Sequence, residues 1–524
     1  MKRTLSVLAF IVVAFFAQAQ SNIDVLHYKF NIDLNDQNDT IVGLAEIKVK
    51  FLEKTESLQL DLISPAQTGK GMKLGITTGP NVSRTLQVYT SFVIQLSKSF
   101  NAGDTATFTI PYSGIPSDGL IISKNKYGKR TFFADNWPNR GHNWLPCHDD
   151  PADKASVEFI ITAPQHYQVV SNGIQVEETN LPANKKRTHW KEEVPISTKV
   201  MVIGVADFAV NLSGTINDCI PVYSWVYPED RDKGFYDYAQ AAEILPWFIK
   251  NVGSYGYKKL ANVQSKTTFG GLENANTIFY SESSVTGTRK SESLITHEIA
   301  HQWFGNMATE KTFAHLWLSE GFATYMTILY FESKYGKDTA IAMLKEDRDQ
   351  VSEFAKHSNR PVVDNTTDYM SLLNRNSYQK GGWILHMLRS QLGDTLFWKS
   401  IQKYYATYGG NTADTDDLRK VFEEVSGKNF EQFFNQWLYQ PGIPRIVITT
   451  KYSEKDKAAE VTITQKQSTP FQFPLTLLIK SGNNNRLEKI MVSKTSETFM
   501  IPVNDKGFAI DADPGCELLF EVVR

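Results

Sequence analysis

The chain has 524 residues, of which 41% are hydrophobic and 21% are charged, and this is the composition of an ordinary globular protein. At this length we expect roughly three or four domains. The formal net charge of -2 gives no indication of a nucleic-acid partner or of a basic patch that would bind a membrane surface.

Residues 1–19 predict a signal peptide. Lys2 and Arg3 precede an apolar run over 5–17, and Ala17-Gln18-Ala19 has the small-x-small pattern of a cleavage site. The run is too short to span a bilayer. We therefore expect cleavage before Gln20 and an exported protein, periplasmic or secreted, without stable membrane insertion. The alternative is a single membrane anchor at this end.

Residues 20–211 predict a large antiparallel β domain. Tyr28, Phe30, Ile32 and Leu34 alternate with polar residues, and a period of two indicates strands with one buried face. The runs over 155–163 and 199–210 are more continuously apolar, which is typical of strands that are buried on both faces.

The pattern changes over residues 212–440, which predict a mainly helical domain. Apolar residues recur at helical spacing over 235–253 and from Lys290 to about Trp437. Four strand-like runs between 445 and 494 follow a linker that contains Pro441, Gly442 and Pro444. Residues 441–524 therefore predict a small β-sandwich.

The chain has three cysteines, Cys147, Cys219 and Cys516. Three thiols cannot all pair within one chain. None of them has metal-ligand spacing from another cysteine. We expect buried free thiols.

The sequence "THEIAHQWFGN", residues 296–306, contains two histidines four positions apart. On a helix such residues lie on the same face, so His297 and His301 can direct two imidazoles at one metal ion. Glu298 lies about 100° around the axis, where it can reach a metal-bound water. The alternative is an ordinary helix with two solvent-facing histidines, because the motif has a real false-positive risk.

A catalytic zinc needs a third protein ligand and an open fourth position. The same helix cannot supply that ligand, because Gly305 and Asn306 are predicted to end it. A second helix is predicted to begin near Trp317, with Glu320 in its first turn. The set His297, His301 and Glu320 therefore predicts one zinc ion per chain.

These motifs resemble those of the zinc aminopeptidases related to aminopeptidase N and the leukotriene hydrolase, which are gluzincin metallopeptidases. "HEIAHQWFGN" and "WLSEGFATY" look like the family's zinc motif, "GGLEN" at 270–274 like its Gly-Ala-Met-Glu-Asn exopeptidase motif, and "SYQKGGWILHML" like its catalytic-tyrosine segment. The resemblance implies a multidomain α+β protein with a saddle-like N-terminal β domain, a thermolysin-like catalytic domain and a C-terminal β-sandwich. Little more than eighty residues follow Ile443, so the active site is expected to be more open than in relatives with a large helical C-terminal domain.

The resemblance also implies roles for individual residues. His297, His301 and Glu320 match the zinc ligands, and Glu298 matches the general base. By the same resemblance Tyr378 stabilises the oxyanion and Glu273 binds the free α-ammonium group of a peptide substrate. Gly270 and Gly271 would let the backbone approach that peptide closely.

One segment departs from the family's pattern. Relatives carry a Gln-x-Glu or Gln-x-Gln element in the N-terminal domain, and this chain has Asp135 and Trp137 at the two positions. Two interpretations are open: Asp135 or Asn136 supplies the second anchor for the substrate amine, or Trp137 shapes the pocket for the first side chain.

The sequence thus predicts an aminopeptidase that acts on peptides with a free N-terminus. Three alternatives are a zinc endopeptidase, an epoxide hydrolase of the same family, and a surface binding protein with a structural zinc. Glu273 argues against the endopeptidase, and a structural site would need neither Glu298 nor Tyr378. The sequence does not specify an oligomeric state.

Overall fold

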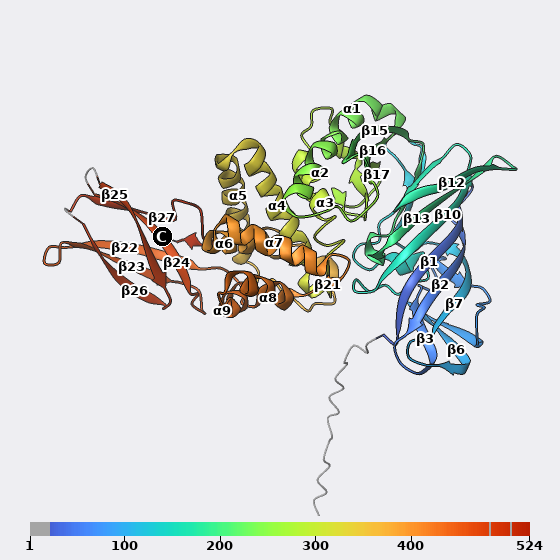
Figure 1. Ribbon diagram of the computed structural model, residues 1–524, viewed down its shortest axis with the longest axis horizontal. Helices are drawn as coiled ribbons and strands as arrows, with labels where there is room; N and C mark the ends of the chain where they lie inside the picture. The colour runs from blue at the N-terminus through green and yellow to red at the C-terminus, as the bar shows by residue number, and fades with distance from the viewer. Residues whose placement is uncertain (1–20, 482–483, 504–505, 524) are drawn as a thin grey trace, which may run out of the picture.

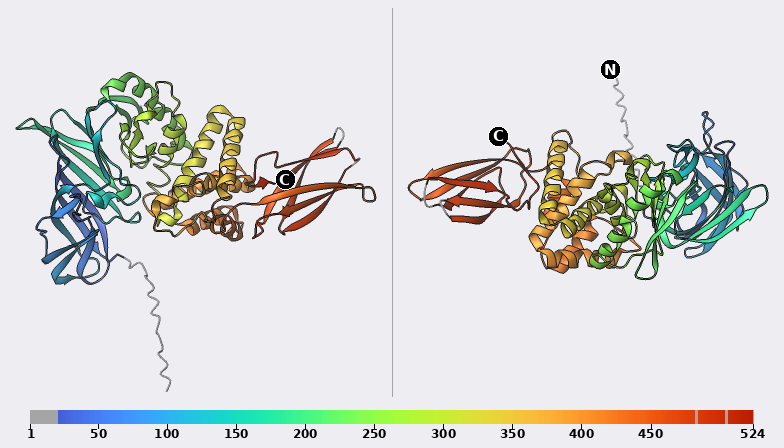
Figure 2. Two further views of the ribbon diagram at one scale, coloured as in Figure 1. Left: turned by 180° about the vertical axis from the view of Figure 1, so that it is seen from behind. Right: turned by 90° about the horizontal axis from the view of Figure 1, so that it is seen from above.

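The computed structural model describes residues 21–481, 484–503 and 506–523, so the predicted signal peptide lies outside the described residues. Three parts follow one another along the long axis: a strand-rich N-terminal region, a central region with the α-helices of the described residues, and a strand-rich C-terminal region (Figure 1). The same order is visible from behind and from above (Figure 2). Within the described ranges no helix has the length and apolarity needed to cross a membrane.

The N-terminal region is built on a sheet of seven strands. The predicted alternation is confirmed, because Tyr28, Phe30, Ile32 and Leu34 are at most 1% exposed. Burying one side of each strand supplies the apolar contact that stabilises the sheet. In spatial order the strands are β12 (Ile174–Leu181), β13 (Lys185–Ser197), β10 (Lys154–Pro164), β1 (Ile23–Asp33), β2 (Ile41–Phe51), β7 (Thr105–Ile115) and β4 (Gly71–Leu74).

One pair of strands departs from the predicted antiparallel arrangement. Strands β1 and β10 are parallel, with Phe30 opposite Phe159, while the other pairs of this sheet are antiparallel. Alternation of apolar residues reports which face is buried and not the direction of the neighbouring strand. A parallel neighbour needs a long crossover connection, and the chain between the two strands provides it.

Two smaller sheets complete the N-terminal region. The segment that follows β9 (Arg130–Ala134) carries Trp137, which lines the cavity described below. Gly119 and Gly173 have positive φ angles, which are typical of glycine in tight turns. The first sheet contains β3 (Thr55–Asp61), β6 (Ser91–Phe100) and β5 (Val82–Val88), and the second contains β11 (Gln168–Ser171), β14 (Ile203–Ala206), β9 (Arg130–Ala134) and β8 (Leu120–Lys124).

The central region contains a five-stranded sheet that the sequence analysis did not predict. Its strands β17 and β19 are short and almost fully buried, and short apolar runs do not distinguish a strand from a buried helix segment. Residue 211, the predicted domain boundary, falls inside β15 of this sheet. The strands in order are β15 (Ala209–Ile216), β16 (Ile220–Val226), β17 (Leu260–Ser265), β19 (Thr277–Ser281) and β18 (Gly271–Leu272).

The predicted helices of the central region are present. The sharpest local signal is at Asp414, which forms a capping box with Asp417 at the start of α8. Two strands of two residues, β20 (Thr309–Glu310) and β21 (Thr412–Ala413), also pair here. The helices are α1 (Arg231–Tyr238), α2 (Gln240–Asn251), α3 (Glu292–Ala300), α4 (Trp317–Tyr335), α5 (Lys337–Ala355), α6 (Gly381–Leu392), α7 (Asp394–Tyr408), α8 (Thr415–Ser426) and α9 (Glu431–Phe434).

The C-terminal region consists of two sheets, as predicted for a β-sandwich. The linker with Pro441 and Gly442 lies between the π-helical turn η8 (Asn435–Tyr439) and β22. The sheets contain β26 (Ser496–Pro502), β23 (Ala458–Gln465), β22 (Arg445–Ser453) and β28 (Glu521–Val522), and β25 (Asn484–Val492), β24 (Phe473–Ser481) and β27 (Phe508–Ala512).

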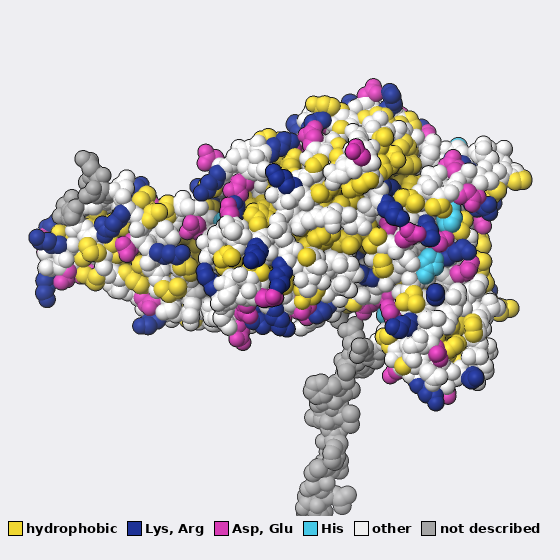
Figure 3. All heavy atoms as spheres, viewed as in Figure 1, with side chains coloured by type: hydrophobic (Ala, Val, Ile, Leu, Met, Phe, Trp, Pro, Cys, Tyr) yellow, Lys and Arg dark blue, Asp and Glu magenta, His cyan; other side chains and the backbone are white. Residues whose placement is uncertain are grey.

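The surface charges and the cysteines can also be compared with the sequence-based predictions. Positive and negative side chains are interspersed over the face in Figure 3, in agreement with the small net charge. All three cysteines are free, and Cys147 and Cys516 are buried as predicted. The prediction is wrong for Cys219, which is exposed, because it lies in the turn between β15 and β16.

Candidate metal and peptide site

Helix α3 brings the two motif histidines together. The Nε2 atoms of His297 and His301 are 3.1 Å apart. The helix ends at Ala300, before the predicted Gly305, but His301 keeps helical angles and its N–H donates to the His297 carbonyl over 3.3 Å. The four-residue spacing therefore still stacks the two side chains on one face.

Glu320, in the first turn of α4, completes the cluster. Its Oε2 lies 3.2 Å from Nε2 of His297 and 3.2 Å from Nε2 of His301. One ligand atom from each of the three residues lies within 4.8 Å of the others. Two imidazoles and one carboxylate are the donor set of a catalytic zinc site with a fourth position left open.

The other ring nitrogen of His301 is also fixed. Nδ1 lies 3.0 Å from the carbonyl oxygen of Phe304, to which it donates, and 3.1 Å from Oγ of Ser319. Such a bond sets the tautomer and leaves Nε2 free to bind a metal. Gly305 allows the turn, because its φ is +110° and a Cβ there would lie 2.2 Å from Oγ of Ser319.

Glu298 is buried beside this cluster, with 5% of its surface exposed. Strand β18 passes so close that a Cβ on Gly271 would lie 2.2 Å from Oε1 of Glu298. Burial raises the pKa of Glu298, His301 lowers it, and the carboxylates of Glu273 and Glu320 raise it further. A metal cation beside the carboxylate would act in the opposite sense.

Tyr378 faces the same cluster from a different element. It lies in a π-helical turn, η7 (Asn376–Lys380), that leads into α6, and such turns are frequent at functional sites. Its ring is stacked on the His297 ring, with 6.0 Å between centroids. Gly321 and Gly381 permit this approach, because a Cβ on Gly321 would lie 2.8 Å from the backbone of Gly381.

Glu273 follows β18 and is 6% exposed. Its side-chain atom Oε1 is buried and has no hydrogen-bond partner. Its backbone carbonyl accepts hydrogen bonds from Nδ2 of Asn306 over 2.6 Å and from Nε2 of Gln302 over 3.0 Å. The backbone of Glu273 is thus fixed by the segment that carries His301, while its carboxylate is left available for a cation.

One cavity of about 630 Å³, including its open mouth, joins these groups. It is lined by every predicted site residue except Asp135, namely His297, His301, Glu320, Glu298, Tyr378, Glu273, Gly270 and Gly271, and by the apolar residues Trp137, Phe269, Leu272, Leu294 and Leu373.

Comparison with known proteins gives the family. The peptidase M1 N-terminal domain matches residues 25–200, and the peptidase family M1 domain matches residues 236–437. The chain belongs to peptidase family M1. The N-terminal β region and the helical central region described above are the two domains of this family.

Curated relatives of this M1 chain are similar over most of its length. It is 23% identical to aminopeptidase 2 of Candida albicans over 94% of the chain and 56% of the relative. It is 29% identical to aminopeptidase A of Gloydius brevicauda over 80% of the chain and 47% of the relative. It is 24% identical to the alanine/arginine aminopeptidase of Saccharomyces cerevisiae over 94% of the chain and 60% of the relative. The chain therefore spans about half the length of these relatives.

The structure does not bring Asp135 to the cavity of this M1 protein. Its side chain is fully buried and forms an ion pair with Arg140, and its Oδ2 accepts from the N–H of Thr268 over 3.3 Å. Burial raises the pKa of Asp135, against the effect of Arg140. Asn136 is equally occupied, since Nδ2 donates to two backbone carbonyls and Oδ1 accepts from Trp144.

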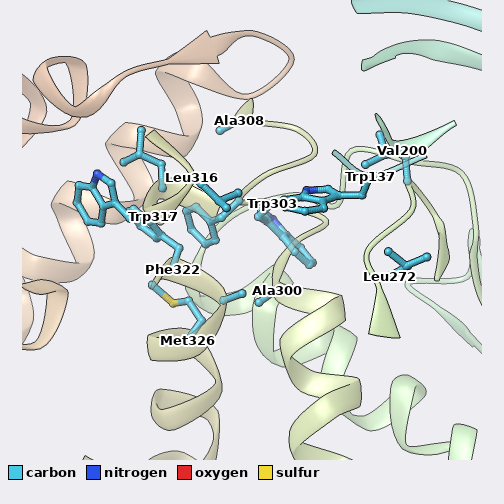
Figure 4. Close-up of a cluster of buried hydrophobic side chains, with 14 of the residues drawn as sticks. Trp137, Val200, Leu272, Ala300, Trp303, Ala308, Leu316, Trp317, Phe322 and Met326 are labelled. Atoms are coloured by element: carbon cyan, nitrogen blue, oxygen red, sulfur yellow. The ribbon is translucent and has the colours of Figure 1, made fainter. Parts of the chain in front are cut away.

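Trp137 is the residue of this segment that reaches the cavity. Its ring packs edge-on against Phe269 at 6.0 Å and against Phe313 at 6.1 Å, and Figure 4 shows it on the side of the buried cluster that also carries Leu272. Of the two open interpretations, the geometry therefore favours the one in which Trp137 shapes the pocket.

Gln302 and Asn306 are functional candidates that the sequence reasoning did not single out. Both belong to the quoted motif, but their signal depends on a contact with Glu273 that spacing alone does not reveal. Phe269, Leu294 and Leu373 were also missed, because an apolar residue on a cavity wall has the same sequence pattern as one in the core.

Proposed function

We propose that the protein is a zinc-dependent aminopeptidase that removes residues one at a time from the N-terminus of peptides. The observation that carries the proposal is the buried, unpaired Oε1 of Glu273 in the same cavity as His297, His301 and Glu320. A buried carboxylate oxygen without a partner is costly, and the α-ammonium group of a peptide would supply one. The aminopeptidase names of the relatives support the same activity.

The metal that suits this site is zinc, one ion per chain. Two imidazole nitrogens and a carboxylate are ligands that zinc accepts, and His301 has the fixed outer hydrogen bond that zinc-binding histidines have. When bound, zinc would polarise the scissile carbonyl group and activate a water molecule.

The protein's own residues would perform the remaining steps. Glu298 accepts a proton from the attacking water and delivers it to the leaving amine. The hydroxyl of Tyr378 donates to the oxyanion that develops on the carbonyl oxygen, and a donor of this kind typically contributes roughly 2.7–4 kcal/mol. Glu273 binds the ammonium group, so only the first peptide bond reaches the reacting groups.

Paired peptides test the proposal directly. One peptide has a free N-terminus and the other is its N-acetylated twin, and the products are followed by mass spectrometry with and without a chelator. We expect stepwise shortening of the free peptide, almost no reaction of the acetylated one, and loss of turnover after chelation. Internal cuts, or equal rates on the two peptides, would show an endopeptidase instead.

We also propose that the protein is exported, to the periplasm or outside the cell. The support is the basic start, the apolar run and the Ala17-Gln18-Ala19 site. Mass analysis of protein recovered from the culture medium and from the periplasm tests this, and the expected mature chain begins at Gln20. A full-length chain that stays with the membrane fraction would contradict the proposal.

A further inference from the structure

A lysine of the N-terminal domain bonds directly to the backbone that follows the second histidine. Nζ of Lys154, on β10, lies 3.0 Å from the carbonyl oxygen of Asn306 and 2.7 Å from that of Met307. Both carbonyls belong to the turn that begins at His301. The lysine thus connects two domains at a point close to the metal ligands.

The same turn positions Glu273. Asn306 accepts from Lys154 with its backbone oxygen, and it donates from Nδ2 to the carbonyl oxygen of Glu273 over 2.6 Å. Asn306 therefore links Lys154 to Glu273 through two hydrogen bonds. A shift of the Asn306 backbone would be passed to Glu273 through a single short hydrogen bond.

The Lys154 ammonium has no carboxylate partner among the ion pairs of the described residues. The nearby acid, Glu310, is paired with Lys199 instead, and both of those side chains are at most 1% exposed. Burial lowers the pKa of Lys154 to about 7, with a further lowering by Lys199 and a raising by Glu310. Burying a lysine amine on two carbonyl groups without a carboxylate partner is costly for stability alone, so this placement is explained better by a positional role.

We propose that Lys154 is a positioning residue for recognition of the substrate's α-ammonium group, acting through Asn306 on Glu273. This inference rests on the proposed aminopeptidase function. The ammonium–Glu273 pair exists in the bound substrate and in the transition state alike. Weakening it removes uniform binding, which raises KM and leaves kcat nearly unchanged.

The test replaces Lys154 with methionine, which keeps most of the volume and removes the donor. For a peptide with a free N-terminus we expect KM to rise about tenfold, because a displaced Glu273 carboxylate would bind the ammonium group less tightly. kcat and the zinc content should stay within about twofold of the wild type. Lys154→Arg retains charge and donors and should recover most of the affinity.

The matched control is Lys29→Met. Lys29 lies on the neighbouring strand β1, and its Nζ forms an ion pair with Oε1 of Glu46 over 3.0 Å. This variant should leave KM unchanged. If Lys154 were only structural, Lys154→Met would instead lower the melting temperature and the yield of active enzyme and leave KM unchanged. That result, or equal KM values for Lys154→Met and Lys29→Met, would overturn the inference.

Calorimetry with leucine amide separates this inference from the proposed function. The zinc-loaded protein should bind the amide, and Lys154→Met should weaken the binding about tenfold. If the wild type turned over no peptide and this difference persisted, the aminopeptidase proposal would fail and the positioning role would stand. Equal binding by both proteins, or no binding by either, would overturn the positioning role.

Discussion

The backbone of Gly271 lies directly against the carboxylate of Glu298, where a Cβ atom would come within 2.2 Å of Oε1. A methyl group at this position must push the Glu298 carboxylate away from its place beside His297 and His301. The glycine is therefore required by a neighbouring side chain and not by its own φ angle.

Gly271→Ala should lower kcat by about 100-fold, because a displacement near 1 Å at a reacting group has an effect of this order. The zinc content should not change, since the three ligands are untouched. Gly270→Ala is the contrast, because its Cβ would meet no atom within 4 Å and any loss there must come from contact with the bound peptide. Equal losses in the two variants would contradict the argument.

The division of roles at the metal gives a second prediction. Glu298→Gln should abolish turnover while the purified protein keeps about one zinc per chain, because Glu298 lies beside the ligand group and is not part of it. His297→Ala should lose both zinc and activity, because two protein ligands bind the metal far less tightly than three. Metal analysis of both proteins is the measurement, and a zinc-free Glu298→Gln protein would count against the assignment.

The sequence predicted the cluster of His297, His301 and Glu320 because its geometry is local. Four-residue spacing on one helix places His297 and His301, and a first-turn carboxylate on the next helix supplies Glu320. The parallel β1–β10 pair and the sheet with β17 and β19 were not predictable in this way, since their contacts join segments far apart in the chain. The position of Asp135 depended on an ion pair with Arg140 that sequence order does not indicate.

Tyr378 gives a third prediction. Burial, with the nearby carboxylates, raises the pKa of its hydroxyl well above the usual value. Tyr378→Phe removes one hydrogen bond and little volume, and kcat should fall about 100-fold with KM nearly unchanged. Steady-state kinetics beside a melting curve is the check, and a loss that follows thermal stability would indicate a packing role.

The cavity wall gives a fourth prediction, which concerns the first residue of the substrate. No lysine or arginine is among the described residues that line the cavity, and its remaining wall is formed by Trp137, Phe269 and three leucines. An acidic first side chain would be buried there without a partner. A basic one would meet only the carboxylates of Glu273, Glu298 and Glu320, which the proposed mechanism already uses. We therefore expect kcat/KM for leucyl and phenylalanyl substrates to exceed that for glutamyl and arginyl substrates by at least about tenfold.

Trp137→Ala should reduce this preference, because it removes apolar surface from the wall. A panel of aminoacyl chromogenic substrates measures the ranking in the wild type and the variant. Trp398→Ala, in α7 and outside the cavity lining, controls for the loss of a tryptophan. The same ranking in all three proteins would remove Trp137 from a role in specificity.

The last prediction concerns Lys380, which is fully buried at the end of the Tyr378 turn. Its Nζ donates to the carbonyl oxygen of Gly442 over 2.8 Å, and none of the ion pairs of the described residues includes it. Burial lowers its pKa from 10.5 to about 7. Between these two values the unfolded chain binds a proton that the folded protein does not.

The free energy of unfolding must therefore rise with pH over that window on account of this group. Below about pH 7 both states are protonated and the contribution is constant. Lys380→Met removes this titrating group. Between pH 7.5 and pH 9.5 the free energy of unfolding of the wild type should therefore rise by about 2 kcal/mol relative to that of the variant. Other titrating groups cancel in the difference between the two proteins.

Calorimetric melting curves of both proteins at the two pH values measure this difference. Lys29→Met is again the control, because Lys29 is partly exposed and paired with Glu46. The difference in the free energy of unfolding between this variant and the wild type should not change with pH. The difference in the free energy of unfolding between the wild type and Lys380→Met could also prove independent of pH. That result would mean that Lys380 keeps its proton in the folded protein. In that case water or a neighbouring group must solvate the ammonium, and its bond to Gly442 would be a charged anchor between the Tyr378 turn and the C-terminal sandwich.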